Sequence, residues 1–150
     1  MTLRALPARR LPLVMAIGAA ISCTTASAPP VERFVVRSSW ARIADSGATS
    51  GAYLEIANND SVSRSLVAVI TDDAAAAEVH ETMQHEEVAH MMPRTDLPIA
   101  AGAVLTMQPG GLHVMLVDMR RALAVGDSVR LRLRFSDSTD VPVTVPVKTP

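Results

Sequence analysis

Within residues 128–135, every residue after Ser128 alternates strictly between apolar and arginine side chains, and this period of two constrains the fold more than any other feature. A strand of this pattern has an apolar face that must pack against a core and a charged face that meets solvent. The apolar positions are Val129, Leu131, Leu133 and Phe135, and the charged positions are Arg130, Arg132 and Arg134.

Six further short apolar or alternating runs are separated by turn residues, and they cover residues 31–36, 51–56, 65–70, 104–107, 112–117 and 141–147. The last of these runs contains prolines, which suit an edge strand. Apolar residues do not recur at helical spacing over three turns, and only residues 74–77 are expected to form a single helical turn. The pattern predicts an all-β domain, either a β-sandwich or a Greek-key barrel.

The composition excludes several classes of protein. The 150 residues suffice for one domain, and 14 Lys and Arg nearly balance 15 Asp and Glu. A nucleic-acid partner is not expected, because nucleic-acid binders concentrate basic charge. The single cysteine excludes an internal disulfide, a cysteine-rich zinc site and a two-cysteine redox motif.

The N-terminal segment has the pattern of a secretory signal. Arg4, Arg9 and Arg10 precede an apolar run over residues 11–21. A run of about eleven residues is too short to span a bilayer but has the length of a signal-peptide core. Export from the cytoplasm of a bacterium therefore follows.

Two cleavage sites fit this signal. Residues 20–23 (Ala-Ile-Ser-Cys) resemble a lipobox, in which Cys23 would carry lipid and become the mature N-terminus. Residues 26–28 (Ala-Ser-Ala) resemble an ordinary cleavage site, although the proline that follows is disfavoured there. We predict a lipoprotein-type signal peptide over 1–22, a linker over 23–30 and a β domain over 31–150. The protein is expected in the periplasm or cell envelope, attached to a membrane only through lipid on Cys23.

Histidine and methionine are concentrated between residues 80 and 119. This stretch holds all four histidines and all six methionines that lie outside the signal segment: His80, Met83, His85, His90, Met91, Met92, Met107, His113, Met115 and Met119. Methionine often fills gaps in cores, and histidine often lies on surfaces. Ten such residues in forty are better explained by a shared role in metal binding.

Strand geometry indicates which of these side chains converge. His113 and Met115 are two residues apart on an expected strand, so they share a face. If residues 78–83 and 88–92 form a hairpin, a register that pairs His80 directly with Met91 brings two imidazoles and two thioethers together.

The same register turns three nearby side chains, Met83, His90 and Met92, away from His80. The turn at residues 84–87 has no glycine to enforce this register. If that turn is a loose loop, His85 or His90 would be available as an auxiliary ligand for a metal ion.

Two His and two Met ligands select for a soft ion. Thioether sulfur is a poor ligand for Mg²⁺ and Ca²⁺, and structural zinc sites use Cys, His and carboxylate ligands. A blue-copper centre needs a thiolate, whereas Cu(I) accepts neutral sulfur and nitrogen donors. The pattern therefore indicates a carrier of Cu(I) that does not cycle its oxidation state.

No enzymatic activity is expected. Residues 80–85 resemble the zinc-protease motif, but the two histidines are five apart instead of four. That spacing would place them about 140° apart around a helix, so they could not bind one ion from a single helical face.

The order of these four residues is similar to the copper-binding signature of the PCuAC family of periplasmic copper chaperones. Ten residues separate His80 from Met91, twenty-one separate Met91 from His113, and one separates His113 from Met115. Residues 109–116 look like that family's Pro-Gly-Gly-x-His-x-Met-Leu segment. Three shorter segments fall where the family has them: Ser-Trp-Ala-Arg at 39–42, Ala-Tyr-Leu at 52–54 and Gly-Asp at 126–127.

The resemblance covers residues 31–147 and implies a cupredoxin-like β-barrel or sandwich with one Cu(I) bound by His80, Met91, His113 and Met115. It also implies delivery of copper to cytochrome c oxidase subunit II or a related acceptor, alongside a Sco-type thiol protein. We expect the protein to be a monomer, and we expect His85 or His90 to serve as the auxiliary ligand if Cu(II) is bound. The chain departs from the family at Glu86-Glu87, where a glycine turn is usual, and at Ala89, where a second methionine is usual.

Two other functions fit the same residues. One is a copper-sequestering envelope protein with no acceptor, and the other is a structural envelope lipoprotein whose Met/His cluster is incidental. Copper binding is expected to weaken as the pH falls towards about 6, because a protonated imidazole cannot bind a metal.

Overall fold

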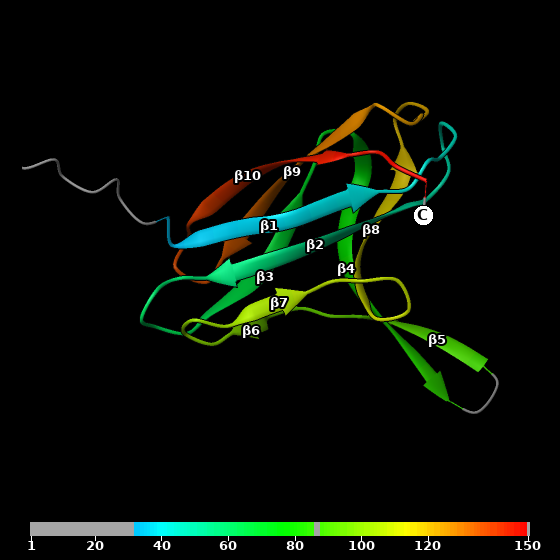
Figure 1. Ribbon diagram of the computed structural model, residues 1–150. Helices are drawn as coiled ribbons and strands as arrows, with labels where there is room; N and C mark the ends of the chain where they lie inside the picture. Colours follow the sequence, from blue (N-terminus) through cyan, green and yellow to red (C-terminus); the bar gives the residue numbers. More distant parts are fainter. Residues whose placement is uncertain (1–31, 86–87, 150) are drawn as a thin grey trace, which may run out of the picture. The chain divides into compact units, whose positions relative to one another are not determined.

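Ten β-strands and no helix make up the computed structural model over the residues that it describes, 32–85 and 88–149 (Figure 1). The strands are β1 (Phe34–Ala41), β2 (Ser50–Asn58), β3 (Arg64–Ile70), β4 (Ala74–His85), β5 (Val88–Pro93), β6 (Leu97–Ile99), β7 (Val104–Thr106), β8 (Leu112–Met119), β9 (Ser128–Phe135) and β10 (Asp140–Pro146). Within those ranges, no helix long and apolar enough to cross a membrane is present. The predicted signal peptide over 1–22, Cys23 and the linker over 23–30 lie outside the described residues.

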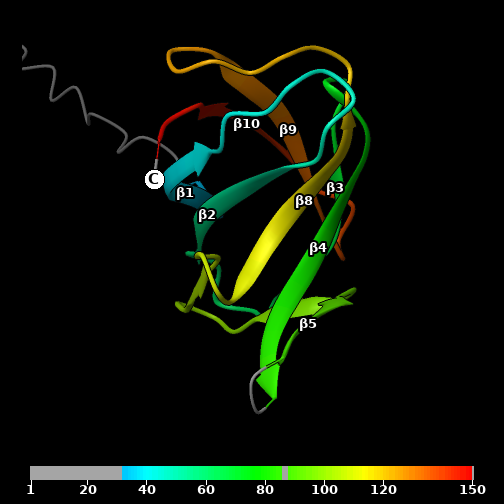
Figure 2. The same ribbon diagram turned by 90° about the vertical axis from the view of Figure 1, so that its right-hand side faces the viewer.

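The strands form two sheets, which confirms the predicted all-β, cupredoxin-like Greek-key class. One sheet has the order β1-β2-β8-β4-β5, with β7 also pairing with β2, and the other has the order β10-β9-β3-β6. Strands that are distant in sequence are neighbours in both sheets, and Figure 2 shows β8 running along β4. This topology joins segments around residues 51, 80 and 114 into one surface.

The core lies between the two sheets. The alternation in β9 is confirmed, because its four apolar residues are buried and its three arginines are exposed. Phe135 of β9 stacks on Phe34 of β1 with ring centroids 3.6 Å apart. Each fully buried aliphatic or aromatic side chain of this kind contributes about 1.5–3 kcal/mol to folding. The proline-containing β10 is an edge strand of its sheet, as predicted.

One short segment differs from its prediction. The helical turn expected over residues 74–77 is wrong, because these alanines begin the twelve-residue β4. Ala74 is buried in the core, and Ala76 and Ala77 pair with β8. Tertiary pairing has overridden the helical preference of alanine there.

The β4–β5 hairpin has a different register from the predicted one. His80 pairs with Pro93, and Thr82 pairs with Met91, so the predicted direct pairing of His80 with Met91 is wrong. The pairing extends to His85 and Val88, so the register is shifted by two residues from the predicted one. Side chains alternate with a period of two, so the shift leaves each residue on its predicted face.

Candidate metal centre

His80 and His113 face each other directly across the pairing of β4 with β8. Their ring centroids are 6.2 Å apart, and their ring planes are inclined by 41°. Both residues are buried, with 9% of His80 and 8% of His113 exposed. The two imidazoles therefore form a buried cross-strand pair, although 32 residues separate them in the sequence.

Met115 lies two residues beyond His113 on β8, on the same face. It pairs with Glu78 of β4 on one side and with Gly51 of β2 on the other. Gly51 has no side chain to fill the space beside the thioether. A cavity of about 530 Å³ opens there, lined by residues that include Gly51, Tyr53, Met91, His113 and Met115.

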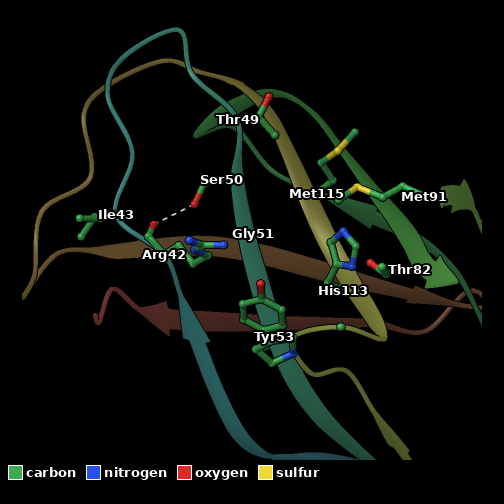
Figure 3. Close-up of a pocket in the computed structure, with 12 residues that line it drawn as sticks. Arg42, Ile43, Thr49, Ser50, Gly51, Tyr53, Thr82, Met91, His113 and Met115 are labelled. Carbon is green, nitrogen blue, oxygen red and sulfur yellow. Dashed lines mark hydrogen bonds between the residues drawn. The ribbon is translucent and has the colours of Figure 1, made fainter. Parts of the chain in front are cut away.

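Met91 reaches this cavity from β5. It pairs with Thr82, which lies two residues beyond His80, so Met91 and His80 share a face without being directly opposed. Figure 3 shows the thioethers of Met91 and Met115 close to each other, with the His113 ring beside them. Met91 is 61% exposed, so this side of the cavity meets solvent.

Three of the four predicted ligands, Met91, His113 and Met115, thus line one cavity. The fourth, His80, is not among the lining residues, but it lies directly opposite His113 on the neighbouring strand. Met83, His90 and Met92 lie on the opposite face of the hairpin, as predicted. The side chain of His85, the other candidate auxiliary ligand, lies outside the described part of the chain.

A hydrogen bond to the turn that precedes β8 fixes the tautomer of His113. Its Nδ1 donates to the carbonyl oxygen of Gly111 at 3.0 Å. A carbonyl only accepts, so the proton is on Nδ1, and Nε2 keeps a free lone pair. The same carbonyl accepts the backbone N–H of Thr82 at 3.1 Å, which ties the turn to β4. This turn depends on Gly110, whose φ of +80° favours glycine.

Glu78 orients His80 in the same way. The carboxylate Oε2 of Glu78 accepts a hydrogen bond from Nε2 of His80 at 2.9 Å, so the lone pair of His80 is on Nδ1. This Nδ1 is buried and has no hydrogen-bond partner among the residues that the structure describes. A buried acceptor without a partner costs about 1–3 kcal/mol, and a bound metal would remove this cost.

The spacing of the rings suits a shared ion. A metal bonded to one nitrogen of each ring at about 2 Å would hold the ring centres at most about 6.3 Å apart. The observed 6.2 Å is close to this limit, which corresponds to a linear N–metal–N arrangement. The rings would therefore have to move closer together to hold an ion that also has thioether ligands. The described residues contain no group of three or more His, Cys, Asp or Glu side chains suited to a metal. The further donors beside His113 are the thioethers of Met91 and Met115, which line the same cavity. Such a donor set favours Cu(I).

Sequence reasoning missed several residues of this site. Tyr53 and Gly51 come from β2, whose pairing with β8 is not evident from the sequence. Tyr53 packs between Trp40, with ring centroids 4.5 Å apart, and His113, at 6.4 Å. The sequence could have indicated Glu78, because it lies two residues before His80 on the expected strand and therefore shares the face of His80.

Comparison with known proteins shows the family to which the chain belongs. Residues 34–147 match the model of the family described as "Putative lipoprotein LpqE-like". A relative named "Putative lipoprotein Lxx21020", from Leifsonia xyli subsp. xyli, is 33% identical over 114 residues, which cover 75% of this chain and 68% of that protein.

Two solved structures share the fold. The copper-bound PCuAC domain from PmoF2 has a TM-score of 0.67 at 22% identity, covering 81% of this chain and 97% of that domain. The Cu(I) form of DR1885 from Deinococcus radiodurans has a TM-score of 0.57 at 30% identity, covering 75% and 78% of the two chains. The resemblance to the PCuAC family is thereby confirmed.

Proposed function

Because this chain belongs to the LpqE-like family and has the PCuAC fold, we propose that it is an extracytoplasmic Cu(I)-binding metallochaperone. The observation that carries the proposal is the buried pair of His80 and His113. Each ring donates one N–H to a fixed acceptor and presents its other nitrogen as a ligand. DR1885, a relative by structure, is described with Cu(I) bound.

Copper is the cargo of this site, held by four neutral ligands: His80 Nδ1, His113 Nε2 and the thioethers of Met91 and Met115. The two imidazoles are buried and oriented by hydrogen bonds, so they form the fixed part of the site. Met91 is the most exposed of the four, on a hairpin that extends beyond the rest of its sheet (Figure 1). An acceptor would therefore displace Met91 first.

Transfer proceeds by exchange of ligands on an ion that remains Cu(I). An acceptor ligand bonds to copper as the Met91 thioether leaves, and the remaining bonds exchange in turn. A thiolate is a stronger ligand for Cu(I) than a neutral thioether, so an acceptor with cysteine ligands draws copper from this site. The acceptor that we propose is cytochrome c oxidase subunit II or a Sco-type thiol protein, as the PCuAC resemblance implies.

We place this activity in the bacterial periplasm or cell envelope. The lipoprotein description of the family and of the Leifsonia relative agrees with the lipobox-like residues 20–23. Mass spectrometry of the mature N-terminus is expected to show a lipidated Cys23. An unmodified N-terminus after residue 28 would contradict the lipid anchor.

Anaerobic titration with Cu(I) against a chromophoric chelator tests the proposed site. The double variant His113→Ala/Met115→Ala is expected to lose tight binding. The matched control, His90→Ala/Met92→Ala, removes the same residue types from the opposite hairpin face and is expected to keep it. Unchanged tight binding in the first variant would refute the site.

A second arm distinguishes delivery from sequestration. The copper-loaded protein is mixed with an apo-acceptor that carries a two-cysteine copper site, and the copper content of each protein is measured after separation. A chaperone transfers its ion within the mixing experiment. Copper that stays on the donor would support the sequestering alternative instead.

A further inference from the structure

We propose that the opposite face of the β4–β5 hairpin carries a second, weaker Cu(I) site formed by Met83, His90 and Met92. Met83 of β4 pairs directly with His90 of β5. Met92 lies two residues beyond His90 on β5 and therefore shares its face. Two thioethers and one imidazole thus lie together on one side of a two-stranded ribbon.

The positions of these side chains are not explained by packing. On β4, Met83 shares a face with Val79, which is buried in the core between the sheets. The hairpin extends past the core, however, and Figure 1 shows its end projecting away from the other strands. Met83 is 46% exposed and Met92 is 52% exposed, and His90 is exposed as well. Methionines that fill core gaps are buried, so these two need another explanation.

The spacing allows all three to reach one ion. Directly opposed residues have Cβ atoms about 4.5–5.5 Å apart, and diagonal neighbours lie about 7–8 Å apart, within reach of long side chains. Met83 and His90 are a direct pair, and Met83 and Met92 are diagonal neighbours. A metal between them would be held by two sulfurs and one nitrogen, a neutral and soft donor set that suits Cu(I).

One carboxylate next to this patch is already paired. Glu81, which lies opposite Met92, has its carboxylate 2.9 Å from the guanidinium of Arg94. The ion pair occupies the end of the patch nearest the core, so Glu81 does not compete with the two thioethers and the imidazole as a donor. No hydrogen bond orients the three donors among the described residues, so we expect weaker binding and faster exchange than at His80 and His113.

The two sites cannot share ligands. Met91 stands between His90 and Met92 in the sequence and points to the other face of the ribbon. The hairpin therefore presents soft donors on both faces, and the protein is expected to bind two equivalents of Cu(I) in sequence. This inference does not depend on delivery of copper to an acceptor.

NMR of the full chain labelled with ¹³C at the methionine methyl groups separates the two sites under anaerobic Cu(I) titration. The first equivalent is expected to shift the methyl signals of Met91 and Met115, and the second those of Met83 and Met92. In His90→Ala/Met92→Ala, the second set of shifts is lost and the first remains. The substituted side chains are exposed, so this variant is expected to fold.

The reciprocal variant, His113→Ala/Met115→Ala, is expected to lose the first set of shifts and keep those of Met83 and Met92. This result would show a second site even if the proposed primary site failed its own test. The inference is overturned if the Met83 and Met92 signals stay unmoved after the first site is filled. It is also overturned if Met83 still shifts in His90→Ala/Met92→Ala as in the unmodified protein.

Discussion

Replacing Glu78 by glutamine tests how the fold prepares His80 to bind copper. The carboxylate accepts the Nε2–H of His80 at 2.9 Å and so presents the buried Nδ1 as the ligand. Glutamine keeps the size of the side chain but removes its charge, and its amide can also donate, so the other His80 tautomer is no longer disfavoured.

The expected loss follows from the exposure of this contact. Removing a hydrogen-bond partner that orients a metal-binding histidine typically costs 10–100-fold in affinity. The Glu78 side chain is half exposed, so water partly replaces the lost interaction. We therefore expect the lower end of the range, a loss of about tenfold in Cu(I) affinity, or about 1.4 kcal/mol.

The assay is competition with a chromophoric Cu(I) chelator under anaerobic conditions. Glu81→Gln is the matched control, because Glu81 is on the same strand but on the opposite face and pairs with Arg94. Glu81→Gln is expected to leave the tight site unchanged. Equal affinities for Glu78→Gln and the unmodified protein would refute the role of Glu78, as would equal losses in the two variants.

Three further substitutions test other parts of the account. A Cβ at Gly51 would lie 3.2 Å from the Tyr53 hydroxyl, so the side chain of Gly51→Val is expected to fill the cavity. This variant is expected to bind Cu(I) more weakly in the same competition assay, and full affinity would contradict the role of the cavity. Gly110→Ala places a side chain at a φ of +80° and is expected to cost about 1 kcal/mol in urea unfolding while also weakening copper binding. The hydrogen bond and charge of Arg134 lower the pKa of Asp140 from its ordinary 3.8. The ionised carboxylate therefore stabilises the fold at pH values above 3.8, and this stabilisation is lost as the pH falls through the lowered pKa. Asp140→Asn should therefore flatten the acid limb of the thermal stability profile below about pH 4, and an unchanged limb would contradict this assignment.

Local patterns predicted the elements well. The alternation over 128–135 matches β9 residue for residue, because a strand buried on one face must repeat its apolar residues with a period of two. The same parity rule correctly placed Met91 on the face of His80 and Met83 on the other face. The hairpin register was wrong by two residues because the turn sequence at 84–87 carries no glycine that fixes the turn position.

Long-range pairing accounts for what the sequence could not predict. The direct opposition of His80 and His113 depends on β8 lying between β2 and β4, which follows from the packing of the whole sandwich. The roles of Gly51 and Tyr53 depend on the same arrangement. The sequence of one strand does not indicate which distant strand will pair with it. The positions of His113, Gly51 and Tyr53 relative to His80 could therefore be found only from the structure.

The most direct test of the central claim is X-ray absorption at the copper K-edge of the protein loaded anaerobically with one equivalent of Cu(I). The account predicts a first coordination shell that contains both imidazole nitrogen and thioether sulfur, two of each. A shell of nitrogen and oxygen alone, without sulfur, would contradict it.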